Sequence, residues 1–263
     1  MDGVNRIEYD GVLCYRVEKL STDLKEEIRG SLAGICHGAE KATSGSSLYT
    51  YKRTLREFLN RFYKKTEATQ KGMIGELLSH VLLTAFEKKY SSINPYFNME
   101  EESIKKGFDL VFSNSDDKNV WLAEVKAGAC SANVDDKLKS LLRLARDDLF
   151  EKLNSSRFAL WQNAINGVAV AVKDISVKKA LSKILERHNE NAVDGLSKSQ
   201  DYNVILIAVA FKGDLIFTAD DETVIREQSS QSIQKKFKSA CMVAIQKSTL
   251  GAIVDFFEDE VTS

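Results

Sequence analysis

Two apolar segments of this sequence carry acidic and basic side chains at a spacing that suits phosphate chemistry. Asp109 lies in the run 108–113, and Glu124 and Lys126 lie in the run 120–127. Both runs have the length and apolar character of β-strands. Side chains alternate along a strand, so Glu124 and Lys126 point to the same face. If the two strands form a hairpin, Asp109 comes back beside Glu124.

These residue types suit metal-assisted hydrolysis of a phosphodiester bond. Two neighbouring carboxylates repel each other and are costly to bury, and a bound Mg²⁺ resolves the conflict because hard cations prefer carboxylate and water oxygens. The metal offsets charge on the scissile phosphate and lowers the pKa of a bound water. A lysine beside it orients or deprotonates that water and stabilises developing negative charge. The pattern therefore predicts Asp109 and Glu124 as metal ligands and Lys126 as their catalytic partner.

A third carboxylate, Glu76, is expected to join this site from an upstream helix. Met73, Ile74 and Leu77 make its surroundings apolar, and Gly75 precedes it directly. Glycine is unfavourable in a helix, but it lets the backbone approach a sheet closely. We therefore expect Glu76 to point into the site as a further ligand or supporting carboxylate, although it could also reach water from the edge of the helix.

An exposed ion pair is the main alternative for Glu124 and Lys126. Alternating charges are common on half-exposed strands, so a bare Glu-x-Lys pattern is weak evidence for catalysis. Here Val120, Trp121 and Leu122 precede the pair. A mostly buried strand favours function, because unpaired buried charges are expensive.

Composition limits the other classes of protein that this chain could represent. The 263 residues are 43% hydrophobic and 29% charged, with a net charge of -1, as expected of a globular protein rather than one that coats DNA with positive charge. The four cysteines form no CxxC pair and the three histidines form no HExxH motif, which argues against a zinc site. No apolar run reaches the roughly 18 residues of a membrane span. No signal peptide is visible at the start, so a cytoplasmic location is expected.

The elements that must position these residues follow from periodicity and turn signals. The order of helices and strands predicts an α/β fold with a mixed central sheet flanked by helices, preceded by an extra hairpin and helices. The apolar run 204–211 should form a central buried strand. We expect two regions, residues 1–66 and a core at 67–263. The expected strands lie at 6–19 (a hairpin around Asp10-Gly11), 108–113, 120–127, 204–211 and 241–246. The expected helices lie at 22–41, 51–66, 70–90, 133–153, within 157–187, and at 227–239, with a polar loop at 189–202.

Three motifs in this order resemble the PD-(D/E)xK nuclease superfamily. They are the helix motif 71–76, the strand motif 107–112 and the strand motif 121–128. The set is similar, more narrowly, to the HamA nuclease subunits of Hachiman anti-phage defence systems. The proline of the superfamily's name is absent, because Gly107-Phe108 precedes Asp109.

The resemblance implies a restriction-endonuclease-like fold, DNA as substrate and Mg²⁺ as cofactor, with Mn²⁺ able to substitute. It also implies a partner helicase, HamB, that restrains the nuclease until infection or DNA damage is sensed. The rival hypothesis is a non-catalytic nuclease-like module that binds DNA or regulates a helicase. Intact Asp109, Glu124 and Lys126 favour the enzyme.

Several other residues are candidates for contact with DNA or with a partner. The basic ones are Lys71, Lys105, Lys106, Lys137 and Arg143. A solvated helix face, balanced by nearby aspartates, is at least as good an explanation for Lys137 and Arg143. The segments before residue 66 and the aromatic stretch around Phe256-Phe257 are candidate docking elements, although these phenylalanines could instead cap the core.

Overall fold

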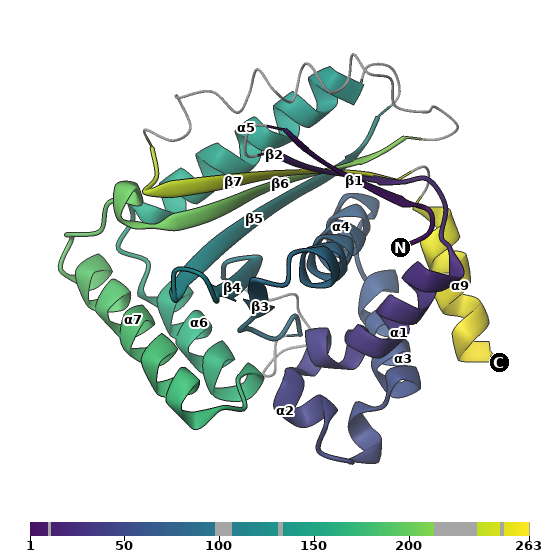
Figure 1. Cartoon of the computed structure of the whole chain (residues 1–263), viewed down its shortest axis with the longest axis horizontal. Coiled ribbons are helices and arrows are strands. Elements are labelled where there is room, and N and C mark those ends of the chain that lie inside the picture. The colour runs from purple at the N-terminus through teal and green to yellow at the C-terminus, as the bar shows by residue number, and fades with distance from the viewer. Residues whose placement is uncertain (10–11, 98–106, 131–133, 213–235, 248–249, 263) are drawn as a thin grey trace.

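The computed structural model describes residues 1–9, 12–97, 107–130, 134–212, 236–247 and 250–262. Within them, seven strands form one mixed sheet in the order β1-β2-β7-β6-β5-β4-β3 (Figure 1). The strands are β1 Val4–Tyr9, β2 Val12–Val17, β3 Tyr90–Ser92, β4 Leu110–Asn114, β5 Asn119–Ala129, β6 Asn203–Phe211 and β7 Ser239–Lys247. The expected α/β class with a mixed central sheet is confirmed.

The centre of the sheet is parallel and its edges are antiparallel. β5, β6, β7 and β2 run parallel, whereas β1, β4 and β3 each pair antiparallel with a neighbour. Every residue of β6 is buried, as predicted for the apolar run 204–211. A strand with both faces covered must be apolar throughout, and only such a run satisfies that position.

The N-terminal hairpin extends this same sheet. β1 and β2 pair antiparallel as expected, although the proposed turn at Asp10-Gly11 lies outside the described residues. β2 then pairs in parallel with β7, from Val12 opposite Met242 to Val17 opposite Lys247. Residues before position 66 therefore contribute strands to the sheet that carries Glu124.

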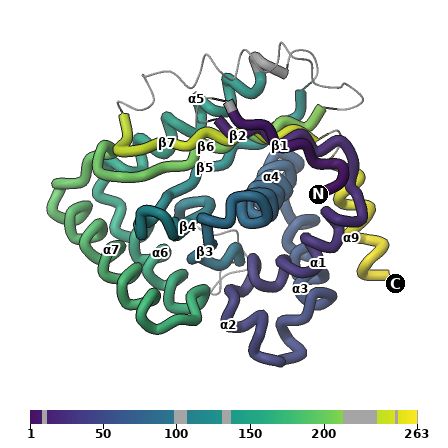
Figure 2. The backbone as a smooth tube through the Cα atoms, viewed as in Figure 1, coloured from purple at the N-terminus to yellow at the C-terminus, as the bar shows by residue number. Residues whose placement is uncertain are grey.

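Helices cover both faces of the sheet, and the tube view shows α5 and α4 on opposite sides of it (Figure 2). The helices are α1 Thr22–His37, α2 Ala39–Ala42, α3 Tyr51–Tyr63, α4 Glu67–Phe86, α5 Val134–Leu153, α6 Phe158–Ala171, α7 Ile175–Val193 and α9 Gly251–Thr262, with 3-10 turns at Ser47–Tyr49 and Ser199–Asp201. Side chains of α1, α3, α4 and α9 form one apolar core with the sheet, and those of α5, α6 and α7 form a second.

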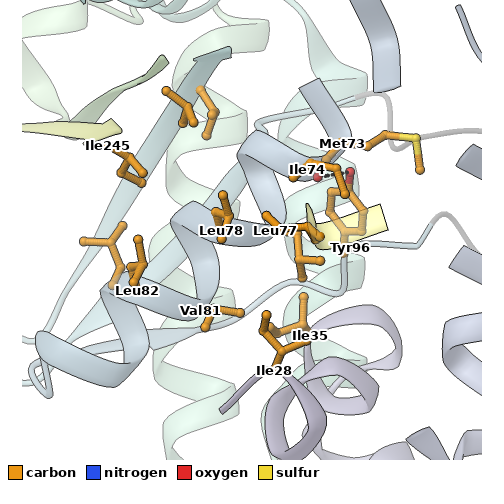
Figure 3. Close-up of a cluster of buried hydrophobic side chains, with 14 of the residues drawn as sticks. Ile28, Ile35, Met73, Ile74, Leu77, Leu78, Val81, Leu82, Tyr96 and Ile245 are labelled. Atoms are coloured by element: carbon orange, nitrogen blue, oxygen red, sulfur yellow. Dashed lines mark hydrogen bonds between the residues drawn. The ribbon is translucent and has the colours of Figure 1, made fainter. Parts of the chain in front are cut away.

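Helix α4 is the centre of the first core. Its side chains Ile74, Leu77, Leu78 and Val81 are each 1% exposed or less, and they meet residues of α1 and β7 (Figure 3). Tyr96 packs beside them and donates a hydrogen bond to the carbonyl of Met73 over 3.3 Å. The helix is thus fixed against the sheet at the turn where Gly75 and Glu76 lie.

Three expectations need correction or lie outside the description. The segment 189–202 is not all loop, because α7 continues to Val193 and buries Asn189 and Ala192. Phe256 and Phe257 are 5% and 0% exposed within α9, so they belong to the first core and are not exposed docking residues. Most of the helix expected at 227–239 falls outside the described residues.

In the described part of the chain, no helix combines the length and apolar character needed to cross a membrane.

Candidate active site

The β4–β5 hairpin brings Asp109 and Glu124 together. Leu110 pairs with Ala123, so Asp109, one residue before β4, lies opposite Glu124. The Asp109 Oδ2 atom accepts a hydrogen bond from the backbone amide of Val125 over 2.8 Å. This contact fixes the Asp109 carboxylate at the edge of β5, as the hairpin model predicted.

Glu124 is almost completely buried, at 1% exposure, and each of its oxygens accepts a hydrogen bond from a lysine. Lys126 Nζ lies 3.0 Å from Oε1, which confirms that the two side chains share a strand face. Lys152 Nζ, from the last turn of α5, lies 2.5 Å from Oε2. A buried carboxylate is tolerated only with such partners, and two ammonium groups satisfy both of its oxygens.

Lys126 is also part of a wider charge network. Its Nζ atom forms an ion pair with Asp148, one turn before Lys152 on α5. Burial acts to lower the pKa of Lys126, but Glu124, Asp148 and Asp109 outweigh burial and raise it. Lys126 is therefore held as an ammonium, which suits stabilisation of negative charge more directly than abstraction of a proton.

Asp109 has an unusual protonation equilibrium for an aspartate. Its pKa is raised from 3.8 to about 7, mainly by burial and further by the neighbouring Glu124 carboxylate. Lys152, the Val125 amide and Lys126 act in the opposite direction without cancelling it. Strongly raised carboxylate pKa values are typical of catalytic and metal sites, where like charges are gathered for function.

Glu76 enters the same electrostatic environment from α4. Burial raises its pKa well above 4.5, with Asp109 and Glu124 adding to the rise. Gly75 explains how the helix comes so close, because a Cβ atom at this position would lie 2.6 Å from the Cβ of Ala127 on β5. The expected close approach of the helix at Gly75 is thus confirmed.

The donor set suits a hard divalent cation. Glu76, Asp109 and Glu124 offer carboxylate oxygens, and their mutual repulsion is the condition that a bound cation relieves. As the described side chains stand, however, no group of three or more acidic, histidine or cysteine residues is arranged to hold a metal. Both oxygens of Glu124 accept hydrogen bonds from lysines in this arrangement. A cation would replace one of these contacts.

Three of the predicted DNA-contacting residues lie on α4 and α5. Lys71 pairs with Glu67 one turn back on α4 over 2.5 Å. Lys137 packs over Gly128 of β5, and Arg143 is exposed on α5. The two remaining candidates, Lys105 and Lys106, lie outside the described residues. The structure therefore gathers the carboxylates and Lys126 at one point, and it places the three described cations, Lys71, Lys137 and Arg143, on α4 and α5.

Lys152 and Asp148 are members of the site that sequence reasoning missed. Both lie on the predicted helix 133–153, four residues apart, so they share a helix face. That spacing was visible, but the sequence does not reveal which helix face meets Glu124. The sequence signal for a second cation is the buried Glu-x-Lys pair itself, because one lysine leaves the second glutamate oxygen unsatisfied.

Comparison with known proteins agrees with this geometry. A protein-family model, HamA, matches residues 4–260. No curated protein matches the chain. Because the family match covers nearly the whole chain, the protein belongs to the HamA family, which takes part in Hachiman anti-phage defence.

Proposed function

We propose that this protein is a Mg²⁺-dependent nuclease that hydrolyses phosphodiester bonds in DNA. The observation that carries the proposal is the placement of Asp109 opposite Glu124 across the β4–β5 hairpin, with Lys126 bonded to Glu124. Membership of the HamA family adds the setting, an antiviral defence system in which such an activity would act as the effector.

The carboxylates and the lysines of the site have different proposed roles. Asp109, Glu124 and Glu76 would hold the cation, which when bound supplies charge neutralisation at the phosphate and a water of lowered pKa. Lys126, held as an ammonium, stabilises negative charge that develops on the scissile phosphate. Lys152 holds the second oxygen of Glu124 and so orients this carboxylate from α5.

A non-catalytic module is the competing function. It would keep the fold and bind DNA or a helicase without cleaving. The free energy needed to bury these carboxylates argues against a non-catalytic module. Burial raises the pKa values of Asp109 and Glu76, and a protein that only binds would gain nothing from keeping both groups there.

The test is plasmid degradation by the purified chain in Mg²⁺ and in EDTA. Glu124→Gln and Lys126→Met should each lower the rate about 100-fold or more, equivalent to a few kcal/mol of transition-state stabilisation. Lys183→Met, on the exposed face of α7, is the matched control and should cleave at the normal rate. Circular dichroism checks that each variant folds. Metal-independent cleavage, or full activity of Lys126→Met, would contradict the mechanism.

The proposal includes a partner that restrains the nuclease. A DNA nuclease without restraint would destroy the chromosome of its own cell, and the partner we propose is a helicase subunit of the same multi-subunit defence system. We expect the chain to co-purify with a helicase encoded beside it, and the complex to leave intact plasmid uncut until DNA ends are supplied. A complex that degrades intact plasmid as fast as the isolated chain would refute this regulation without touching the site assignment.

A further inference from the structure

A pocket of about 470 Å³ opens beside the candidate active site. Its lining comes from the segment before β4, the last turn of α5 and the start of α6. The lining residues are Gly107, Lys152, Arg157, Phe158, Ala159 and Leu160. Lys152 belongs to both places, because its ammonium group contacts Glu124 while its side chain lines the pocket. Whatever occupies the pocket therefore lies next to Lys152 and close to the carboxylate of Glu124.

The lining combines one exposed aromatic ring with positive charge. Phe158 is 53% exposed, unlike most aromatic residues of this protein, which are buried in the two cores. The side chain of Arg157 is 51% exposed, and its ion pair with Glu151 is at the surface, where such pairs are weak and exchange readily. The described lining contains two cations and no acidic residue.

We propose that this pocket, the Phe158 pocket, receives the base of an unpaired nucleotide adjacent to the scissile phosphate. An exposed aromatic ring offers a stacking surface that accepts any base, and the exposed guanidinium of Arg157 beside it binds a backbone phosphate. The volume lies within the range of small-molecule sites, which is enough for one nucleotide. The inference rests on the proposed nuclease function and makes it more specific.

Stacking on the Phe158 ring requires a base that is not paired within a duplex. A base within a duplex is stacked and paired, so its face is open to stack on the Phe158 ring only in a single strand, at a frayed end or after extrusion from the helix. The pocket therefore selects DNA with unpaired nucleotides. Because stacking does not depend on which base is present, it gives no sequence preference.

The experiment compares cleavage of two fluorescein-labelled substrates in Mg²⁺, a blunt duplex and the same duplex with a single-stranded 3′ extension. Phe158→Ala should lower kcat/KM on the extended substrate about fivefold or more, the loss expected for one stacked base. Phe158→Leu should remain impaired, because it fills the space without an aromatic face, and Phe158→Tyr should restore the rate. Phe150→Ala is the matched control, since Phe150 is 37% exposed on α5 but does not line the pocket.

The outcomes separate this inference from the function on which it rests. Phe158→Ala equal to wild type on both substrates, or equally impaired on both, overturns the unpaired-base pocket while the nuclease assignment stands. Rescue by leucine as full as that by tyrosine overturns stacking in favour of simple packing. If the wild-type chain and its helicase complex cleave neither substrate, the nuclease proposal fails first.

Discussion

Lys152 and Glu124 form a 2.5 Å hydrogen bond that joins the end of α5 to β5, the strand that carries Glu124 and Lys126. Glu124 is 1% exposed, so it cannot replace a lost lysine with bulk water. This one contact links the packing of α5 on the sheet to the orientation of a proposed metal ligand. It also makes the lysine testable as a positioning residue.

Lys152→Met should destabilise the fold by about 2 kcal/mol, because a hydrogen bond between charged groups is lost and one oxygen of a buried carboxylate is left unsatisfied. Urea unfolding at pH 7 measures the change. Lys183→Met, at an exposed position of α7, should alter stability little. Equal stability of the two variants would show that the contact between Lys152 and Glu124 makes no net contribution to the free energy of unfolding.

Asp109→Asn should weaken Mg²⁺ binding about tenfold or more, because one anionic ligand is removed from the site. The metal-free protein should become more stable, since a buried carboxylate beside Glu124 is replaced by a neutral group that still accepts the Val125 amide. Calorimetric titration with Mg²⁺ and thermal unfolding in EDTA measure both effects.

Asp147→Asn is the control for this change, because Asp147 is exposed on α5 and pairs with Arg146. It should leave Mg²⁺ affinity unaltered. If Asp109→Asn binds the cation as tightly as wild type, Asp109 is not a ligand.

The sequence predicted the local part of the site better than the long-range part. Glu124 and Lys126 share a strand face because of the two-residue repeat of a strand, and Asp109 lies opposite because two strands joined by a short turn pair antiparallel. Lys152 reaches Glu124 across 28 residues, and this contact depends on how α5 crosses the sheet. No periodicity within either segment encodes that crossing.

The same distinction between local and long-range contacts explains which parts of the fold could be predicted. The fully apolar run of β6 predicted a central strand, and the helical spacing of Ile74, Leu77 and Val81 predicted a helix face packed on a core. In contrast, the parallel pairing of β2 with β7 joins residues more than two hundred positions apart. Phe256 and Phe257 were ambiguous for this reason, because a short apolar stretch packs equally well in a core or an interface until its neighbours are known.

Gly75→Ala should destabilise the protein by about 1–3 kcal/mol, because the added methyl group would lie 2.6 Å from Ala127 and force α4 away from β5. Cleavage should also fall, since Glu76 follows directly. Gly72→Ala is a control in the same helix, where a Cβ atom meets nothing within 4 Å. It should stabilise by up to about 1 kcal/mol through helix propensity alone. Thermal unfolding of both variants measures these changes. If Gly75→Ala stabilised the protein, α4 would not approach β5 closely at this position.

Glu87→Gln tests whether the N-terminal hairpin and α4 form one cooperative unit. Glu87 directly follows the last residue of α4, is 8% exposed, and accepts hydrogen bonds from Arg6 of β1 over 2.6 Å and from Tyr15 of β2 over 2.7 Å. Burial acts to raise the pKa of Glu87, but Arg6 and Tyr15 outweigh burial and hold it below 4.5. A carboxylate with a depressed folded-state pKa stabilises the fold above its unfolded pKa, and this stability is lost as the pH falls through the folded value.

We therefore expect Glu87→Gln to lower the free energy of unfolding by about 1–3 kcal/mol at pH 7. The difference from wild type should shrink as the pH falls below 4.5, because Glu87 takes up a proton in the unfolded chain before it does so in the folded protein. Urea unfolding at a series of pH values measures it, with Glu186→Gln at an exposed position of α7 as the control. Unfolding should follow a single transition in every case, because the hairpin shares the sheet with β7. A constant difference at all pH values would remove the charge of Glu87 from the explanation, and a separate early transition would show that the hairpin folds independently of the site.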